Sequence, residues 1–128
     1  MDSKRILILD DEPGITFSLS RFLRSDKVDV IACNDSQTAR SAVEDGQVDA
    51  VIADVKISVI NERESIDFIQ YLRSRNDNLP LIMMSGTEDL KSEAMKRGAN
   101  YFFQKPFDLD ELLHLLNDLG LEVGKKHC

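Results

Sequence analysis

The 128-residue sequence predicts an α/β domain in which helices cover both faces of a parallel sheet. Short apolar runs alternate five times with segments in which apolar residues recur at helical spacing. Several of the runs are continuously apolar, as expected of strands that are covered on both faces. A chain of this length fits one compact domain with its own hydrophobic core.

The first apolar run, residues 6–9, predicts the first strand. Pro13 suits the first turn of the helix that follows, because its missing N–H would have no partner there. The apolar positions of residues 15–23 recur every three or four residues, which predicts that helix.

Residues 28–33 predict the second strand. Asp35 offers an N-cap for the next helix, and Gly46 is placed to close it. Residues 50–53 then predict the third strand, which is short and entirely apolar.

The second half repeats the alternation. A third helix contains residues 66–72 and ends before residue 76, and residues 81–84 form the fourth strand. A fourth helix begins near Asp89 and ends at Gly98. Its apolar pattern is weaker than that of the other predicted helices.

Residues 101–103, all aromatic, predict the fifth strand. The last helix follows Asp108, whose side chain can cap it, with Glu111 in the position of the acid of a capping box. The leucines of this helix form a stripe wider than one core-facing side requires, at positions 109, 112, 113, 115, 116 and 119. Core packing and a binding face for a partner or a second copy of the chain both remain open.

Polar residues follow four of the predicted strands directly or within two positions: Asp10, Asp11, Asp54, Ser85 and Lys105. Ligands of open α/β sheets bind beyond the carboxyl ends of the strands, so we expect these side chains to meet. Carboxylates packed together repel one another unless a cation lies among them. The sequence therefore predicts a divalent-ion site.

Mg²⁺ prefers oxygen ligands and commonly binds one or two carboxylates together with a phosphate. Asp11 and Asp54 are candidates for direct ligands, and Asp10 for holding a coordinated water. The main-chain carbonyl of Lys56 is a candidate for one more oxygen.

Beside such an ion, a carboxylate oxygen of Asp54 can attack phosphorus and form an aspartyl phosphate. Lys105 would neutralise charge on the phosphoryl group, and Ser85 would donate its hydroxyl to a phosphoryl oxygen. No general base is needed, since an aspartate is already ionised at neutral pH.

The segment Leu7-Ile8-Leu9-Asp10-Asp11-Glu12, Asp54, Ser85-Gly86 and Lys105-Pro106-Phe107 together resemble the receiver domain of two-component response regulators. The resemblance implies a flavodoxin-like (βα)5 doubly wound sheet with strand order 2-1-3-4-5. It also implies a single receiver domain over residues 1–128, with a core from about 5 to 119 and a short tail at 120–128.

The resemblance also implies roles for individual residues. Asp54 would accept a phosphoryl group, with Mg²⁺, from a histidine kinase phosphohistidine or a small phosphodonor. The remaining implied roles are metal binding by Asp10 and Asp11, phosphate binding by Lys105, a switch hydroxyl at Ser85, a switch aromatic at Phe102, and tuning of phosphoryl lifetime at Lys56 and Thr87. Core packing is the alternative for Phe102, and the family commonly has a cis peptide before Pro106.

The implied function is two-component signalling by a phosphoprotein, rather than catalysis on outside substrates. The implied partners are a histidine kinase or phosphotransfer protein and a downstream protein or effector domain. A homodimer is a further candidate assembly. The switched surface would comprise the fourth helix, fifth strand and fifth helix.

One segment departs from the family pattern. Ser58 and Glu62 stand where receiver domains usually have Pro and Gly, so we expect an atypical loop over residues 55–65, about three residues longer than usual. This loop is the support for an alternative, a phosphorylation-independent adaptor with a receiver fold.

Composition and motifs argue against several other classes of protein. The net charge of −7 argues against direct nucleic-acid binding, and no apolar run reaches the roughly 20 residues needed to span a membrane. Two cysteines and no signal-peptide pattern favour the cytoplasm. The contiguous acids Asp10 and Asp11 disfavour an Asp-x-Asp phosphohydrolase, and no phosphate loop of an electron-transfer flavodoxin follows the first strand.

Overall fold

The computed structural model describes residues 3–10, 12–46, 48–54, 59–75, 78–86, 88, 91–121 and 123. Strands and helices alternate along these residues, as predicted. The strands are β1 (Lys4–Leu9), β2 (Val28–Cys33), β3 (Ala50–Asp54), β4 (Leu81–Ser85) and β5 (Tyr101–Gln104). The helices are α1 (Pro13–Leu23), α2 (Ser36–Asp45), α3 (Val59–Arg75), α4 (Lys91–Arg97) and α5 (Leu109–Asp118).

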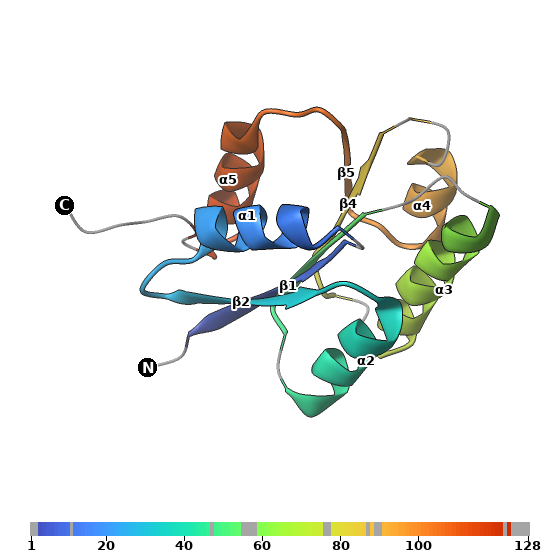
Figure 1. Ribbon diagram of the computed structural model, residues 1–128, viewed down its shortest axis with the longest axis horizontal. Coiled ribbons are helices and arrows are strands. Elements are labelled where there is room, and N and C mark those ends of the chain that lie inside the picture. Colours follow the sequence, from blue (N-terminus) through green and yellow to red (C-terminus); the bar gives the residue numbers. More distant parts are fainter. Residues whose placement is uncertain are drawn as a thin grey trace.

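The strands form one parallel sheet in the order β2-β1-β3-β4-β5, which confirms the predicted flavodoxin-like topology (Figure 1). β1 pairs with β2 on one side and with β3 on the other. Strand order therefore reverses between β1 and β3, which is where ligands of such sheets bind. The carboxyl ends of these two strands lie next to each other, since Leu9 is in register with Ala53.

Helices α1 and α5 cover one face of the sheet, and α2, α3 and α4 cover the other (Figure 1). Successive side chains of a strand point to opposite faces. Accordingly, Ile6 and Ile8 pack with Leu112 of α5, whereas Leu7 packs with Phe68 of α3. Every residue of β3 and β4 is buried, as the continuous apolar runs predicted.

Two predicted N-caps are present. The Asp35 carboxylate accepts a hydrogen bond from the Thr38 N–H at 2.7 Å, and the Asp108 carboxylate accepts one from the Asp110 N–H at 2.9 Å. Gly98 ends α4 with a φ of +131°, a conformation that glycine adopts far more readily than residues with a side chain.

Replacing Asp35 with alanine is expected to lower the free energy of unfolding at neutral pH and to matter less in acid. Hydrogen bonds from Thr38 hold the pKa of the Asp35 carboxyl below its ordinary value of 3.8. The charged cap therefore stabilises the folded state above pH 3.8, and this contribution is lost as the pH falls through the lowered pKa. Urea unfolding of both proteins at neutral pH and in steps below pH 3.8 measures the difference.

The control is Asp35→Asn, which keeps a capping oxygen that does not titrate. The difference in free energy of unfolding between the asparagine and alanine variants should stay constant with pH. If the wild type stays more stable than the alanine variant by the same amount in acid, this account of the cap is contradicted.

The segment after β3 differs from the prediction. The prediction of a loop over residues 55–65 is wrong from residue 59 onwards, because α3 begins at Val59 and continues for 17 residues to Arg75. No Pro or Gly interrupts this stretch, and Glu62, Arg63 and Glu64 are good helix formers. Without the family's helix-breaking residues, the helix extends back towards β3. Residues 55–58 lie outside the described part of the chain.

The leucine stripe of α5 is used mainly for core packing. Leu112 and Leu116 are completely buried, and the partly buried leucines 113, 115 and 119 pack against the same core cluster. Leu109 is the exception, with 39% of its surface exposed. An interaction surface on α4, β5 and α5 stays a prediction.

The packed core continues beyond residue 119, its expected limit. After Gly120, whose φ is +88°, Leu121 and Val123 are buried in the cluster under α1 and α5. Residues 124–128 lie outside the described part of the chain. None of the helices in the described part combines the length and apolar character that crossing a bilayer requires.

Candidate functional site

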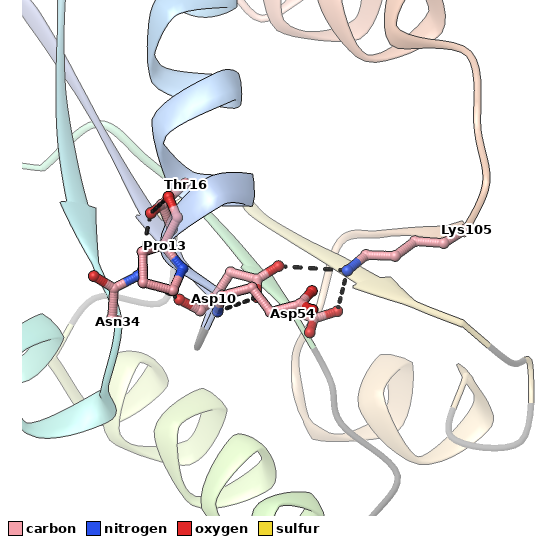
Figure 2. Close-up of polar contacts among 7 residues, drawn as sticks. Asp10, Pro13, Thr16, Asn34, Asp54 and Lys105 are labelled. Atoms are coloured by element: carbon pink, nitrogen blue, oxygen red, sulfur yellow. Dashed lines mark hydrogen bonds and ion pairs between the residues drawn. The ribbon is translucent and has the colours of Figure 1, made fainter.

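Three of the predicted site residues meet at the carboxyl edge of the sheet. Asp10 follows β1, Asp54 ends β3, and Lys105 follows β5. The Lys105 Nζ lies 2.9 Å from Asp54 Oδ1 and 3.4 Å from Asp10 Oδ2, so one ammonium group joins both carboxylates (Figure 2). Residues that are 95 positions apart in the sequence therefore form one polar site.

Burial makes this charge arrangement costly. The Asp10 and Asp54 side chains are 0% and 3% exposed, and that of Lys105 is 27% exposed. Carboxylates with so little access to water require compensating charge or hydrogen bonds. Here one lysine ammonium group contacts both aspartates.

Asp10 is held at several atoms. Its Oδ1 accepts a hydrogen bond from the Glu12 N–H at 3.0 Å, while its Oδ2 faces Lys105. Its main-chain N–H donates to the Cys33 carbonyl at 3.1 Å, and its carbonyl accepts from the Asn34 side-chain amide at 2.8 Å. The end of β2 therefore supports the Asp10 backbone.

Ser85 lies one strand further along and is completely buried. It follows Met84, the residue in register with Asp54. The Ser85 carbonyl accepts a hydrogen bond from the Lys105 main-chain N–H at 2.6 Å, which ties the end of β4 to the start of the β5–α5 connection. The expected cis peptide between Lys105 and Pro106 is confirmed.

Phe102 is half-buried and packs against the core cluster on the α2–α3–α4 face. This contact is consistent with core packing and leaves its switch role a prediction. Three other predicted residues, Asp11, Lys56 and Thr87, lie outside the described residues.

The donor set suits a hard divalent cation. Asp10 and Asp54 offer carboxylate oxygens, the ligand type that Mg²⁺ prefers. Within the described residues these two acids are a pair, and no group of three or more His, Cys, Asp or Glu side chains gathers there as a metal site. The chemistry of these two acids therefore fits a divalent cation such as Mg²⁺.

An apolar groove of about 520 Å³ adjoins the site. Lys105 and Pro106 form one part of its wall, and α1 contributes Ile15, Ser18 and Leu19. Ile15 is 37% exposed, so apolar surface reaches solvent close to the lysine.

Asn34 and Thr16 are not among the residues that the sequence patterns predicted. The Asn34 amide also donates to the Thr16 hydroxyl at 3.1 Å, so it joins the end of β2 to the first turn of α1 beside Asp10 (Figure 2). Asn34 directly follows a predicted strand, as Asp10 and Asp54 do. The rule that strand ends carry the site could therefore have identified it.

Comparison with known proteins identifies one family. The response regulator receiver domain matches residues 6–117, which is most of the chain. The resemblance predicted from the motifs is thereby confirmed.

Curated relatives show the same similarity. The regulatory protein AtoC of Escherichia coli (strain K12) is 32% identical over 125 residues, which cover 95% of this chain and 26% of AtoC. The transcriptional regulatory protein TcrA of Mycobacterium tuberculosis (strain ATCC 25618 / H37Rv) is 32% identical over 118 residues, covering 91% of this chain and 46% of TcrA. The chain thus spans half or less of the length of these relatives.

Solved structures share the fold. The response regulator TrrA of Thermotoga maritima, crystallised in complex with Mg²⁺–BeF, has a TM-score of 0.77 at 24% identity. The superposition covers 91% of this chain and 98% of TrrA.

Proposed function

The chain belongs to the response regulator receiver domain family, and on this premise we propose that it is a phosphorylation switch whose acceptor is Asp54. The observation that carries the proposal is the single lysine shared by two buried carboxylates at the strand ends. Family membership is consistent with a role in two-component signalling.

Asp54 acts as the nucleophile. One of its carboxylate oxygens forms a bond to the phosphorus of a phosphohistidine or a small phosphodonor. With phosphohistidine, the P–N bond breaks and its electron pair stays on the imidazole nitrogen. With acetyl phosphate, the bond from phosphorus to the acetate oxygen breaks and acetate leaves with the electron pair. Lys105, already 2.9 Å from Asp54 Oδ1, is placed to balance the charge that the phosphoryl group brings.

Mg²⁺ is the proposed cofactor. Asp10 and Asp54 would hold it, together with Asp11 and the main-chain carbonyl of Lys56. When bound, the ion would supply positive charge that offsets the negative charge of the phosphoryl group. The Mg²⁺–BeF complex of TrrA, a protein of the same fold, supports this choice.

Phosphorylation is read out as a change of surface. Ser85, buried one strand from Asp54, is the hydroxyl that would engage the phosphoryl group. Movement there would pass to Phe102 of the neighbouring β5, and would bias two arrangements of α4, β5 and α5. Thr87 would tune the lifetime of the phosphoryl group.

The proposed partners are a histidine kinase or phosphotransfer protein as donor, and a downstream protein or effector domain as target. The groove beside Lys105 gives a donor protein apolar surface next to the acceptor. The proposal also includes a single receiver domain over the whole chain and a cytoplasmic location. It includes no direct nucleic-acid contact by this domain and no catalysis on outside substrates. The adaptor alternative rested on the segment after Asp54, most of which is helical in α3.

Intact-mass spectrometry after treatment with acetyl phosphate and MgCl₂ tests the acceptor. We expect wild type to gain the mass of one phosphoryl group and Asp54→Ala to gain none, because the substitution removes the carboxylate proposed as the nucleophile. Leaving out MgCl₂ should reduce the gain in wild type at least about tenfold.

The matched control is Asp29→Ala, which removes an exposed acid of β2 far from Lys105. This variant should be modified as wild type is. Equal modification of Asp54→Ala and wild type would refute the assignment of Asp54.

A further inference from the structure

Asn34 connects two segments around the acid Asp10. Its side-chain nitrogen donates to the Asp10 main-chain carbonyl at 2.8 Å and to the Thr16 hydroxyl at 3.1 Å (Figure 2). An amide NH₂ has two hydrogens, so one group can make both bonds. The carbonyl of Asp10 can only accept, which requires the nitrogen and not the oxygen of Asn34 to face it.

Thr16 is the buried half of this connection. It is 3% exposed, and its hydroxyl donates to the Pro13 carbonyl at 3.0 Å while accepting from Asn34. The hydroxyl therefore uses both its donor and an acceptor site, and joins the start of α1 to the residue after β2.

Hydrogen bonds hold both the main chain and the side chain of Asp10. Asn34 holds the Asp10 carbonyl, and the N–H of Glu12 holds Asp10 Oδ1. The other oxygen, Oδ2, is thereby left directed at Lys105 and the position next to Asp54. A rotation of the Asp10 peptide unit would disturb this alignment.

We propose that Asn34, acting through the Asp10 carbonyl and Thr16, is a positioning residue that holds the Asp10 carboxylate in the orientation used by Mg²⁺. This inference rests on the proposed function for its link to the metal. Outer groups that orient metal ligands commonly change metal affinity by about 10- to 100-fold when removed. Asn34 itself is exposed, so its effect on the site should exceed its effect on folding.

The test uses the whole chain and two readouts. MgCl₂ titrations followed by backbone amide chemical shifts give the Mg²⁺ affinity. Hydrogen exchange of the Glu12 N–H in metal-free protein reports directly on its bond to Asp10 Oδ1. Urea unfolding of each variant shows whether it folds.

We expect Asn34→Ala and Thr16→Val to weaken Mg²⁺ binding by about 10- to 100-fold and to speed exchange of the Glu12 N–H. Thr16→Ser keeps the hydroxyl and should restore both readouts to near the wild-type values. This threonine pair also carries the test if Asn34→Ala fails to fold.

The matched control is Asn100→Ala. The Asn100 side chain also joins two elements, accepting from the Leu81 N–H at 2.8 Å and from Arg73 at 2.9 Å, but at the amino ends of β4 and β5. Its loss should leave Mg²⁺ affinity and Glu12 exchange unchanged.

If wild type binds Mg²⁺, either readout staying at its wild-type value in Asn34→Ala and Thr16→Val overturns the proposal. If wild type does not bind Mg²⁺, the proposed function fails instead. The exchange of the Glu12 N–H then decides alone whether Asn34 positions Asp10.

Discussion

Replacing Lys105 with methionine is expected to lower the free energy of unfolding of the metal-free protein by about 3–5 kcal/mol. The variant keeps an apolar chain of similar length but removes the ammonium group shared by Asp10 and Asp54. Two carboxylates with almost no exposure to water then lose the positive charge that both contact. Urea unfolding at neutral pH in the presence of EDTA measures the loss.

Two further measurements identify the cause. Adding MgCl₂ should recover part of the lost stability, because a bound cation replaces the missing charge. Asp10→Asn in the Lys105→Met background should recover part of it without metal. Lys91→Met, which removes an exposed lysine of α4, should change stability by less than about 0.5 kcal/mol. Similar losses at positions 91 and 105 would rule out the charge explanation.

Replacing Phe68 with alanine is expected to cost about 3–5 kcal/mol of stability. Phe68 is completely buried and belongs to the core cluster between the sheet and the helices α2, α3 and α4. Its ring also stacks with Tyr71 at a centroid distance of 6.4 Å. Truncation would therefore leave a large cavity, measurable by urea unfolding followed by circular dichroism.

Phe17→Ala is the matched control, since Phe17 lies on α1 with 62% of its surface exposed. Its contact with the Arg21 guanidinium, 5.7 Å from the ring centroid, is a solvent-exposed cation–π pair. The expected cost at position 17 is below about 1 kcal/mol. If the two alanine substitutions lower the free energy of unfolding equally, the assignment of the core would be wrong.

Much of the fold follows from local sequence patterns. Residues 6–9 and 81–84 are apolar at every position, which is typical of strands that are covered on both faces of a sheet. The residues at strand ends then converge because parallel strands share one carboxyl edge. Asp10, Asp54 and Lys105 could therefore be selected from the sequence alone.

Other features have no such pattern. The start of α3 depends on the absence of helix breakers and the helix propensity of residues 62–64, whereas comparison with the family pattern suggested a loop. Asn34 could have been selected by its place at a strand end, but the bond of its side chain to the Asp10 main-chain carbonyl, 24 positions away, follows from no spacing rule. Leu121 and Val123 follow a glycine that ends the helix, so periodicity could not assign them to the core.

The burial of these last two residues also determines where anything joined to the domain is attached. A tag or effector domain fused after position 123 would leave from a point anchored in the packing beneath α1 and α5, rather than swing from the last turn of α5. Because the attachment point is packed beneath α5, a small displacement of α5 would then also shift the fused partner.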